Sequence, residues 1–402
     1  EKAVDLNLEI ARQAFDKAGE PLRLVPHLDQ EPLPLVTGNE AIALGAVQAG
    51  LDMYIAYPMT PASGILHYLA AHEQELAVVT VHPESEIGVA LMALGAAYAG
   101  ARTMVGTSGG GFALMTEALS LAGQGEFPIV FAECQRPGPS TGVPTYSMQA
   151  DLFFVIHAGH GEFARVVLAP GDAEEAFHLS GLALNLAWQF QIPTFILSDK
   201  HLSESIFSFA ADIDQVEPFE PLLWDGQGEY KRYRQTPDGI SPLAYPGNPG
   251  AVVKVTSYEH DEYGITTEEP EQIVSMQQKR LRKKEALLKE LAQQQQVKTY
   301  GNSAADTVIL CWGSTKGSCV EVAEELGLRV VQPLVLEPFP IEPLKSSLAG
   351  AEKIIAVELN TTGQLAQLLR AHGFNIDHLV LRFDGRPFTV DQLAERIREV
   401  LQ

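Results

Sequence analysis

Residues 103–112 read Thr-Met-Val-Gly-Thr-Ser-Gly-Gly-Gly-Phe. A short apolar run that passes directly into a glycine-rich turn is typical of a buried parallel strand leading into a helix. The turn exposes backbone amides at the start of the predicted helix 112–122, where they can bind an anion. Neither a P-loop nor a dinucleotide-binding glycine motif is present, so a purely structural strand-to-helix turn is an equal interpretation.

The same alternation of apolar runs and helical stretches continues from residue 38 to about residue 205. The predicted strands are 53–57, 77–82, 103–107, 128–134, 164–168 and 193–197. The predicted helices are 40–50, 63–72, 84–99, 112–122 and 174–190, the first capped by Asn39. This pattern predicts an α/β fold with a doubly wound parallel sheet, which binds ligands outside the carboxyl ends of its strands.

Polar residues follow several of these strand ends. The run Tyr57-Pro58-Met59-Thr60-Pro61-Ala62 comes after one predicted strand, and Arg136 closely follows another. Thr60 can hold a small anion through its hydroxyl group and the turn amides, and Arg136 can grip a carboxylate at two points. With Glu86 after the strand 77–82, these residues predict a pocket for a small acidic substrate and a nitrogenous cofactor.

Glu86 is open to two interpretations from the residues alone. Pro83, taken as the start of the helix, places Glu86 in its first turn on a stripe continued by Ala90 and Ala93. A carboxylate on an apolar stripe is costly without a partner, which favours a functional role. Alternatively, Glu86 only interacts with the positive end of the helix. Glu84 is nearly equivalent by helical position, and periodicity does not choose between the two.

Composition excludes some classes of function. The chain has 402 residues, with 46% apolar residues, 20% charged residues and a formal net charge of −23. This charge argues against binding to nucleic acid, which needs clustered Lys and Arg, and it is most simply interpreted as promoting solubility. No apolar run reaches the ~18 residues of a membrane span. With no recognisable secretory leader, a cytoplasmic protein is expected.

The metal-binding residue types are too scattered for a site. The three cysteines, Cys134, Cys311 and Cys319, form no C-x-x-C pair, which argues against a disulfide framework or an iron–sulfur cluster held by this chain. A reducing cytoplasm fits this usage. The histidines lack a third ligand at metal-binding spacing, so no metal is assigned to this chain.

Four segments are predicted along the chain. Residues 1–36 form an N-terminal arm, with a helix at 6–18 and a proline-rich stretch from Pro21 to Pro34. Residues 37–205 form the sheet domain, and 206–300 an interdomain excursion with a charged helix at 276–296. Residues 301–402 resume the alternation, with strands at 307–312, 329–334, 353–358 and 379–382 and helices at 316–326, 363–372 and 390–401.

Several motifs resemble those of one known family over about residues 37–402. The most specific are Tyr57-Pro58-Met59-Thr60-Pro61 and the run Gln135-Arg136-Pro137-Gly138-Pro139-Ser140-Thr141-Gly142. Others are Glu84-Ser85-Glu86-Ile87, Trp312-Gly313-Ser314-Thr315-Lys316-Gly317 and Asp384-Gly385-Arg386-Pro387. They resemble the alpha subunit of 2-oxoacid:ferredoxin oxidoreductases, most of all the 2-oxoglutarate branch. The resemblance implies a thiamine diphosphate pyrimidine-binding domain at 37–205 and a transketolase C-terminal-like domain at 301–402.

The resemblance also implies a reaction and roles for residues. The family cleaves a 2-oxoacid with coenzyme A, giving acyl-CoA, CO2 and electrons for ferredoxin. Glu86 is implied to be catalytic, pairing with the aminopyrimidine ring nitrogen of thiamine diphosphate. The implied substrate-binding residues are Thr60, Arg136 and Thr145. The implied cofactor contacts, besides Glu86, are Tyr57, Pro58, Ser108 and Gly109.

Two family features are missing from this sequence. The Gly-Asp-Gly signature that holds the diphosphate with Mg2+ is not present, and neither is the cysteine set of a [4Fe-4S] cluster. In the family both belong to the beta subunit, so we expect a shared cofactor and a dimer of alpha–beta heterodimers. A γ-type domain precedes the alpha region in many relatives, whereas about 36 residues precede it here, which leaves the coenzyme A site open.

Alternatives remain for substrate and role. The expected substrate is 2-oxoglutarate, with pyruvate or a branched-chain 2-oxoacid as alternatives. Arg165, Lys231 and Arg232 are candidates for binding a distal carboxylate, although that group can also lie on the partner. A noncatalytic assembly or acceptor-docking subunit is a different class of function. A stand-alone thiamine enzyme is disfavoured by the missing Mg2+ signature.

Overall fold

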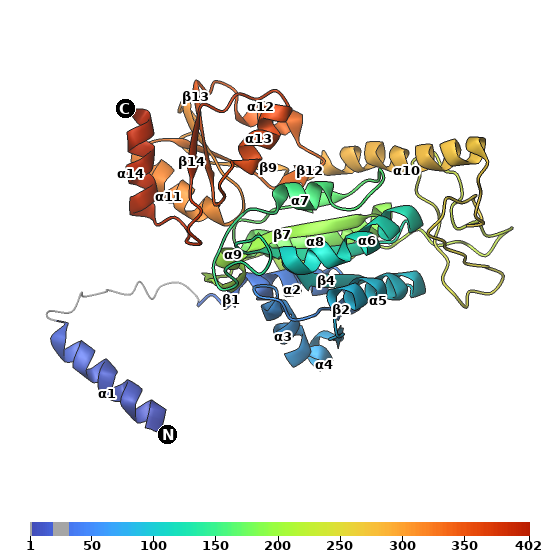
Figure 1. The fold of residues 1–402 in the computed structure, drawn as a ribbon, viewed down its shortest axis with the longest axis horizontal. Coiled ribbons are helices and arrows are strands. Elements are labelled where there is room, and N and C mark those ends of the chain that lie inside the picture. The colour runs from blue at the N-terminus through green and yellow to red at the C-terminus, as the bar shows by residue number, and fades with distance from the viewer. Residues whose placement is uncertain (1, 19–31) are drawn as a thin grey trace. The chain divides into compact units, whose positions relative to one another are not determined.

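The computed structural model describes residues 2–18 and 32–402, which divide into two compact units at Pro34. The first unit contains the helix α1 (Lys2–Lys17), longer than the predicted 6–18, and every one of its described side chains is exposed. Most of the predicted proline-rich stretch, residues 21–31, lies outside the described residues. The second unit carries all the other elements, and they are shown in Figure 1.

The core of the second unit is a seven-stranded sheet with the order β12-β6-β7-β5-β4-β2-β3. Its strands are β2 (Met53–Ile55), β3 (Val79–Val81), β4 (Thr103–Thr107), β5 (Ile129–Gln135), β6 (Val166–Leu168), β7 (Pro193–Asp199) and β12 (Val335–Glu337). All neighbours are parallel except β12, which pairs antiparallel with β6. The predicted α/β doubly wound sheet is therefore confirmed.

Helices cover both faces of this sheet. The elements between the strands are α2 (Gly38–Gln48), α3 (Ser63–Ala71), α4 (Glu73–Leu76), α5 (Glu86–Ala99), α6 (Gly109–Gly125), α7 (Leu152–His157), α8 (Ala173–Phe190) and α9 (Lys200–Glu204). One core joins α2, α3 and α8 to one face, and a second core joins α5, α6 and α7 to the other. On β5, Val130 and Ala132 enter the first core while Ile129 and Phe131 enter the second, as the two-residue period of a strand requires.

A five-stranded sheet with the order β14-β13-β10-β11-β9 follows near the C-terminus. Its elements are β9 (Val297–Gly301), β10 (Thr307–Leu310), α11 (Lys316–Leu326), β11 (Arg329–Pro333), α12 (Ile341–Ser347), β13 (Lys353–Glu358), α13 (Gln364–Ala371), β14 (His378–Leu381) and α14 (Val390–Leu401). It lies at the opposite end of the unit from residues 216–268 (Figure 1). Trp312, Leu365 and Leu369 share the second core with α5 and α6, so apolar packing is continuous between the sheets.

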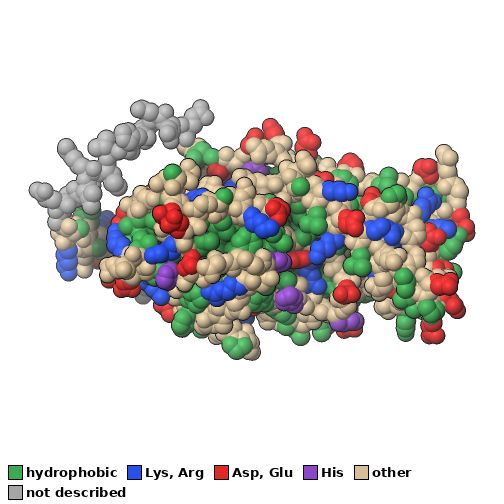
Figure 2. Space-filling model, turned by 90° about the horizontal axis from the view of Figure 1, so that it is seen from above, with side chains coloured by type: hydrophobic (Ala, Val, Ile, Leu, Met, Phe, Trp, Pro, Cys, Tyr) green, Lys and Arg blue, Asp and Glu red, His purple; other side chains and the backbone are tan. Residues whose placement is uncertain are grey.

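Smaller elements complete the unit: an antiparallel pair of β1 (Leu35–Thr37) and β8 (Ile206–Ser208), and the 3-10 turns η1 (Ile213–Gln215) and η2 (Gly313–Thr315). Among the described residues, no helix is long and apolar enough to cross a membrane. Acidic and basic side chains alternate over the face shown in Figure 2.

Two helix starts differ from the predictions because capping depends on local geometry. Asn39 does not cap α2; Thr37 does, since its hydroxyl accepts from the amide of Glu40 while the Glu40 carboxylate accepts from the amide of Thr37. Pro83 does not start α5. Ser85 is its cap, with extended backbone and an Oγ that accepts from Gly88 N, so Glu86 is the first helical residue.

The long helix α10 (Pro270–Leu291) begins six residues before the predicted start, with Pro270 in its first turn. Its basic run, Lys279 to Lys284, is only partly exposed to solvent. Lys279 and Lys283 are fully buried, and both ammonium groups contact the carboxylate of Glu126 at 2.8 Å and 2.5 Å. Glu126 ends α6 in a left-handed conformation, and Arg232 donates to its carbonyl. This buried cation cluster (Glu126, Lys279, Lys283 and Arg232) joins α10 to the sheet domain.

The cluster is electrostatically demanding. Burial alone would raise the pKa of Glu126, but the ammonium groups of Lys279 and Lys283 hold it well below its usual value. Burial also lowers the pKa of Lys283, to about 7. A carboxylate that compensates several buried cations has a much larger effect on stability than a surface ion pair.

Glu126→Gln is expected to destabilise the protein by about 3–5 kcal/mol, because it leaves buried ammonium groups without their counterion. The midpoint of thermal unfolding measures this loss. Glu117→Gln is the matched control, since Glu117 is exposed on the same helix. Equal midpoints for the two variants would contradict the role assigned to the cluster.

Candidate functional site

The carboxyl ends of β2, β4 and β5 lie at one edge of the sheet because these strands are parallel neighbours. The turn that carries Thr60 follows β2, and Arg136 is the first residue after β5. Arg136 Nη1 donates to the carbonyl oxygen of Thr60 at 2.8 Å. Asn39 supports the same turn by donating to the carbonyl of Pro61 at 2.9 Å. The structure therefore brings together two of the predicted substrate-binding residues.

A cavity of about 430 Å³, which we call the Arg136 cavity, opens beside this contact. It is lined by Met59, Ser108, Gly109, Gly110, Ala113, Arg136, Gly138, Pro139, Ser140, Thr141, Asp151 and Phe154. The Thr60 bond is the single hydrogen bond of the Arg136 guanidinium to another described residue, so its other N–H groups remain available. An available guanidinium edge suits a carboxylate.

Glu86 is not among the residues that line this cavity, but it lies against Gly111, which follows the lining residue Gly110, and only 5% of its surface is exposed. Its side chain lies against α6: a Cβ atom built on Gly111 would be 2.8 Å from Glu86 Oε1 and would collide with the Thr107 hydroxyl. No hydrogen bond joins the Glu86 carboxylate to a described residue. A buried glutamate whose carboxylate has no partner within the described chain is suited to bind an external donor or acceptor.

The remaining predicted residues are distributed unevenly. Ser108 and Gly109 line the Arg136 cavity, whereas Tyr57, Pro58 and Thr145 do not. Tyr57 is partly exposed and packs edge-on against His82, with ring centroids 5.8 Å apart. Pro58 and Thr145 are exposed. These three residues therefore contact a ligand only if it extends beyond the cavity.

The candidates for a distal carboxylate are occupied elsewhere. Arg165 donates to the carbonyl of Val155 and stacks on Phe163, and Arg232 belongs to the buried cation cluster. Lys231 pairs with Glu262 at 2.8 Å. None of the three lines the Arg136 cavity, and among the described residues that line it Arg136 is the only Lys or Arg.

Two carboxyl groups at this edge of the sheet were not predicted from the sequence. Asp151, before α7, lines the Arg136 cavity. Glu133, on β5, is fully buried, and neither of its side-chain oxygens has a hydrogen-bond partner among the described residues. Burial and the nearby Asp151 and Asp199 raise the pKa of Glu133 well above its usual value, against the opposing effect of Arg136. Alternation along β5 could have flagged Glu133, but no sequence signal pointed to Asp151.

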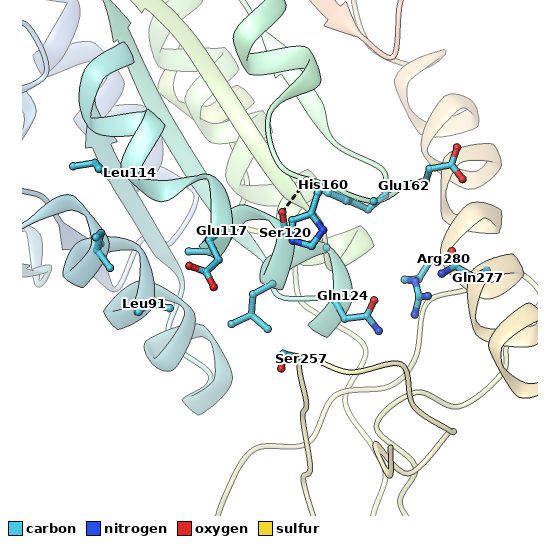
Figure 3. A pocket seen from close by; sticks show the side chains of 16 residues that line it. Leu91, Leu114, Glu117, Ser120, Gln124, His160, Glu162, Ser257, Gln277 and Arg280 are labelled. Atoms are coloured by element: carbon cyan, nitrogen blue, oxygen red, sulfur yellow. Dashed lines mark hydrogen bonds between the residues drawn. The ribbon is translucent and has the colours of Figure 1, made fainter. Parts of the chain in front are cut away.

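A second cavity, of about 460 Å³, lies between α5, α6, the loop at 160–163 and α10 (Figure 3). Leu91 and Leu114 lie toward one side of it, and Arg280 and Gln277 come from α10 on the other. The backbone N–H of His160 donates to Ser120 Oγ at 2.9 Å, while Arg280 is paired with Glu259. It contains none of the predicted site residues.

Comparison with known proteins identifies the family. The family model described as "Pyruvate flavodoxin/ferredoxin oxidoreductase, thiamine diP-bdg" matches residues 44–279, more than half of the chain. The chain is 37% identical, over 98% of its length, to the 2-oxoacid:ferredoxin oxidoreductase subunit alpha of Saccharolobus solfataricus. The chain belongs to the alpha-subunit family of 2-oxoacid:ferredoxin oxidoreductases. This confirms the resemblance found in the sequence.

Other members of this alpha-subunit family carry more specific names. The 2-oxoglutarate oxidoreductase subunit KorA of Mycobacterium tuberculosis is 32% identical over 91% of the chain and 57% of its own length. The chain spans about two thirds of the Saccharolobus protein, 66% of its length. Its residues therefore correspond to part of the longer alpha subunits.

Solved structures agree with this family assignment. The 2-oxoglutarate:ferredoxin oxidoreductase from Magnetococcus marinus, solved with 2-oxoglutarate, coenzyme A and succinyl-CoA bound, matches with a TM-score of 0.89 and 34% identity, covering 100% of this chain and 72% of that one. A split gene transketolase matches over 91% of this chain and 98% of its own, with a TM-score of 0.52 and 14% identity. The latter supports the fold alone.

Gly111→Ala is expected to destabilise the protein by about 1–3 kcal/mol, because the new Cβ atom would meet Thr107 and Glu86 in a filled space. Gly110→Ala is the matched control: its Cβ atom would meet nothing closer than Ser140 O at 3.9 Å. Because alanine favours a helix over glycine, the control should keep or raise the midpoint of thermal unfolding. A Gly111→Ala midpoint as high as that of the control would refute the close packing at Glu86.

Proposed function

We propose that this chain is the catalytic alpha subunit of a thiamine diphosphate-dependent 2-oxoacid:ferredoxin oxidoreductase. One 2-oxoacid and one coenzyme A would give one acyl-CoA, one CO2 and one proton, and two electrons would reduce two oxidised ferredoxins. The observation that carries the proposal is Glu86, which is buried, has no hydrogen-bond partner among the described residues and lies against Gly111, next to the cavity-lining Gly110. The family model, whose description includes thiamine diphosphate binding, supports it.

The residues present fit the pyrimidine half of this cofactor. Glu86 is a buried residue whose carboxylate can accept a hydrogen bond from a protonated ring nitrogen, while Ser108 and Gly109 supply a hydroxyl group and a backbone amide at the start of α6. Tyr57 and Pro58 lie on the exposed side of the same strand ends. When bound, thiamine diphosphate supplies the nucleophile that adds to the keto carbon and accepts the electrons left by loss of CO2.

Arg136 and Thr60 would orient the substrate. The guanidinium, held in place by the Thr60 carbonyl, can bind the carboxylate next to the keto group. The Thr60 hydroxyl is half-buried and can donate to the same group. Thr145 lies on the exposed part of the loop, from where its hydroxyl group would donate to the bound substrate.

The proposed substrate is 2-oxoglutarate. Support comes from the KorA relative and the Magnetococcus structure, both named for 2-oxoglutarate. A five-carbon diacid needs a second cation for its distal carboxylate, and the described lining of the cavity contains Arg136 alone. That second cation would come from the partner chain.

We further propose a beta subunit as the partner, which would carry Mg2+, the diphosphate site and a [4Fe-4S] cluster. Ile87, Leu91 and Leu114 leave about half of their surfaces exposed on α5 and α6, close to Glu86. Apolar side chains grouped beside a site are typical of a surface that a partner covers. Coenzyme A and ferredoxin would be bound by the assembled alpha–beta dimer of dimers, in the reducing cytoplasm that three buried free cysteines suit.

Glu86→Gln, assembled with the beta subunit, is expected to lower the rate of CO2 release at least about 100-fold, because an amide cannot hold the proton that a carboxyl group holds. Release of labelled CO2 from a carboxyl-labelled 2-oxoacid measures the rate. Glu84→Gln is the matched control, since Glu84 is exposed two residues away, and should stay within about twofold of the parent. Full activity of assembled Glu86→Gln would rule out the proposal in favour of a noncatalytic subunit.

Among 2-oxoacids, we expect kcat/KM for 2-oxoglutarate to exceed that for pyruvate or branched-chain 2-oxoacids by about tenfold or more, since a paired distal carboxylate contributes about 1–3 kcal/mol. Reduction of a viologen dye by the assembled enzyme measures the rates. Equal values for 2-oxoglutarate and pyruvate would contradict the substrate assignment and leave the proposed reaction intact.

A further inference from the structure

Asp151 is a second charged group in the Arg136 cavity, and no role has yet been assigned to it. Its backbone is fixed on both sides. The amide N–H of Asp151 donates to Gln135 Oε1 at 3.0 Å, its carbonyl accepts from Val155 N, and the preceding carbonyl of Ala150 accepts from Gln364 Nε2. These contacts hold the residue between β5, α7 and α13, so its side chain cannot leave the cavity by a small shift of the loop.

The carboxylate of Asp151 lies against the start of α6. A Cβ atom built on Gly109 would be 2.6 Å from Asp151 Oδ2. Although Asp151 stands at the cap position of α7, its side chain makes no capping hydrogen bond, and no hydrogen bond joins the carboxylate to a described residue. The side chain is thus not explained by a structural role within the described chain.

Ser108 points to a ligand at the same place. It lines the cavity, none of its surface is exposed, and its hydroxyl group has no hydrogen-bond partner among the described residues. As the residue before α6, it stands where the first amides of a helix favour an anion. A buried hydroxyl without a partner is costly unless a ligand satisfies it.

An anion in this cavity would meet both Arg136 and Asp151. Arg136 favours the anion, whereas an ionised Asp151 repels it in a half-buried site where charges are weakly screened. Two further carboxyl groups face this region, Glu133 from β5 and Asp199 from β7, while Arg136 is the only Lys or Arg in the part of the lining that the structure describes. Burial raises the pKa of Glu133 well above its usual value, and the Asp199 carboxylate accepts hydrogen bonds from Ser147 Oγ and Leu202 N. Asp151 lines the cavity and its carboxylate has no such partner among the described residues, so it is the group left to respond.

We propose that Asp151 is a further ligand-binding residue of the Arg136 cavity, and that it takes up a proton when a 2-oxoacid binds to Arg136. The neutral carboxyl group then donates a hydrogen bond to the bound carboxylate or keto oxygen instead of repelling it. This inference rests on the proposed function, because the ligand is the proposed substrate.

The protonation state of the free protein is compatible with this step. Burial raises the pKa of Asp151 to about 6, so the residue is mostly ionised at pH 7 and can accept a proton there. A bound anion raises the pKa further. Binding is therefore accompanied by proton uptake, and the dissociation constant rises with pH above about 6.

Calorimetry on the assembled alpha–beta complex tests the proposal. Glu86→Gln is used as the background so that 2-oxoglutarate binds without turnover. Titrations at pH 7 in two buffers of different ionisation enthalpy should show uptake of nearly one proton per site. Between pH 6 and pH 8 the dissociation constant should rise by up to about tenfold per pH unit.

Asp151→Asn replaces the neutral acid by a permanent donor of the same size. In this variant the uptake should vanish, the dissociation constant should change less than about twofold between pH 6 and pH 8, and binding at pH 8 should be at least about tenfold tighter than with Asp151. Asp391→Asn, exposed in the first turn of α14, is the control and should keep the uptake.

The two proposals fail in different ways. Turnover of 2-oxoglutarate by the unmodified complex with no proton uptake on binding would overturn the role of Asp151 and keep the proposed function. Uptake that persists in Asp151→Asn would also overturn it. If the unmodified complex neither binds nor turns over any 2-oxoacid at any pH, the proposed function fails first. The number of protons taken up on binding is measured with Asp151 in place, so this test does not depend on whether the Asp151→Asn variant folds.

Discussion

One hydrogen bond, from the Arg136 guanidinium to the carbonyl of Thr60, connects the two strand ends on which the candidate site is built. It spans from β5 to the turn after β2, across β4, and it can form because the three strands are parallel and end at one edge. The bond fixes the direction of the guanidinium and leaves its outer edge available. Glu86 reaches the same place from α5, where Gly111 leaves room for it.

The pKa values of the buried carboxyl groups are shifted in opposite directions by their surroundings. Glu126 is surrounded by cations and stays ionised, and its role is to connect α10 to the sheet. Glu133 is buried next to other acids, and both effects raise its pKa well above the usual value. Asp151 stands between these extremes. Burial alone separates its pKa from the usual range, and no partner among the described residues settles its charge. The protonation state of such a carboxyl group, which has no charged partner, is the most easily changed by a bound ligand.

The sequence predicted the sheet well because its strands are short apolar runs bounded by turns, and that pattern is local. The strand-end residues Thr60 and Arg136 followed from the same pattern. Helix starts were less predictable: the choice of Thr37 over Asn39, and of Ser85 over Pro83, depends on backbone angles and on which side chain reaches a free amide. The burial of Lys279 could not be predicted, because its partner Glu126 lies 153 residues away. The place of Asp151 in the cavity likewise depends on contacts distant in sequence, such as that between Ala150 and Gln364.

The antiparallel strand β12 has a consequence for dissecting the molecule. It comes from the C-terminal part of the chain, yet it closes the outer side of β6 in the larger sheet through Val335 and Glu337. A fragment cut before this strand would leave the outer edge of β6 with unpaired backbone amides and carbonyls. Such an edge is a template for pairing with another copy of the fragment. Shortened versions of the larger sheet domain are therefore expected to self-associate unless the strand Val335–Glu337 is kept, for instance by circular permutation.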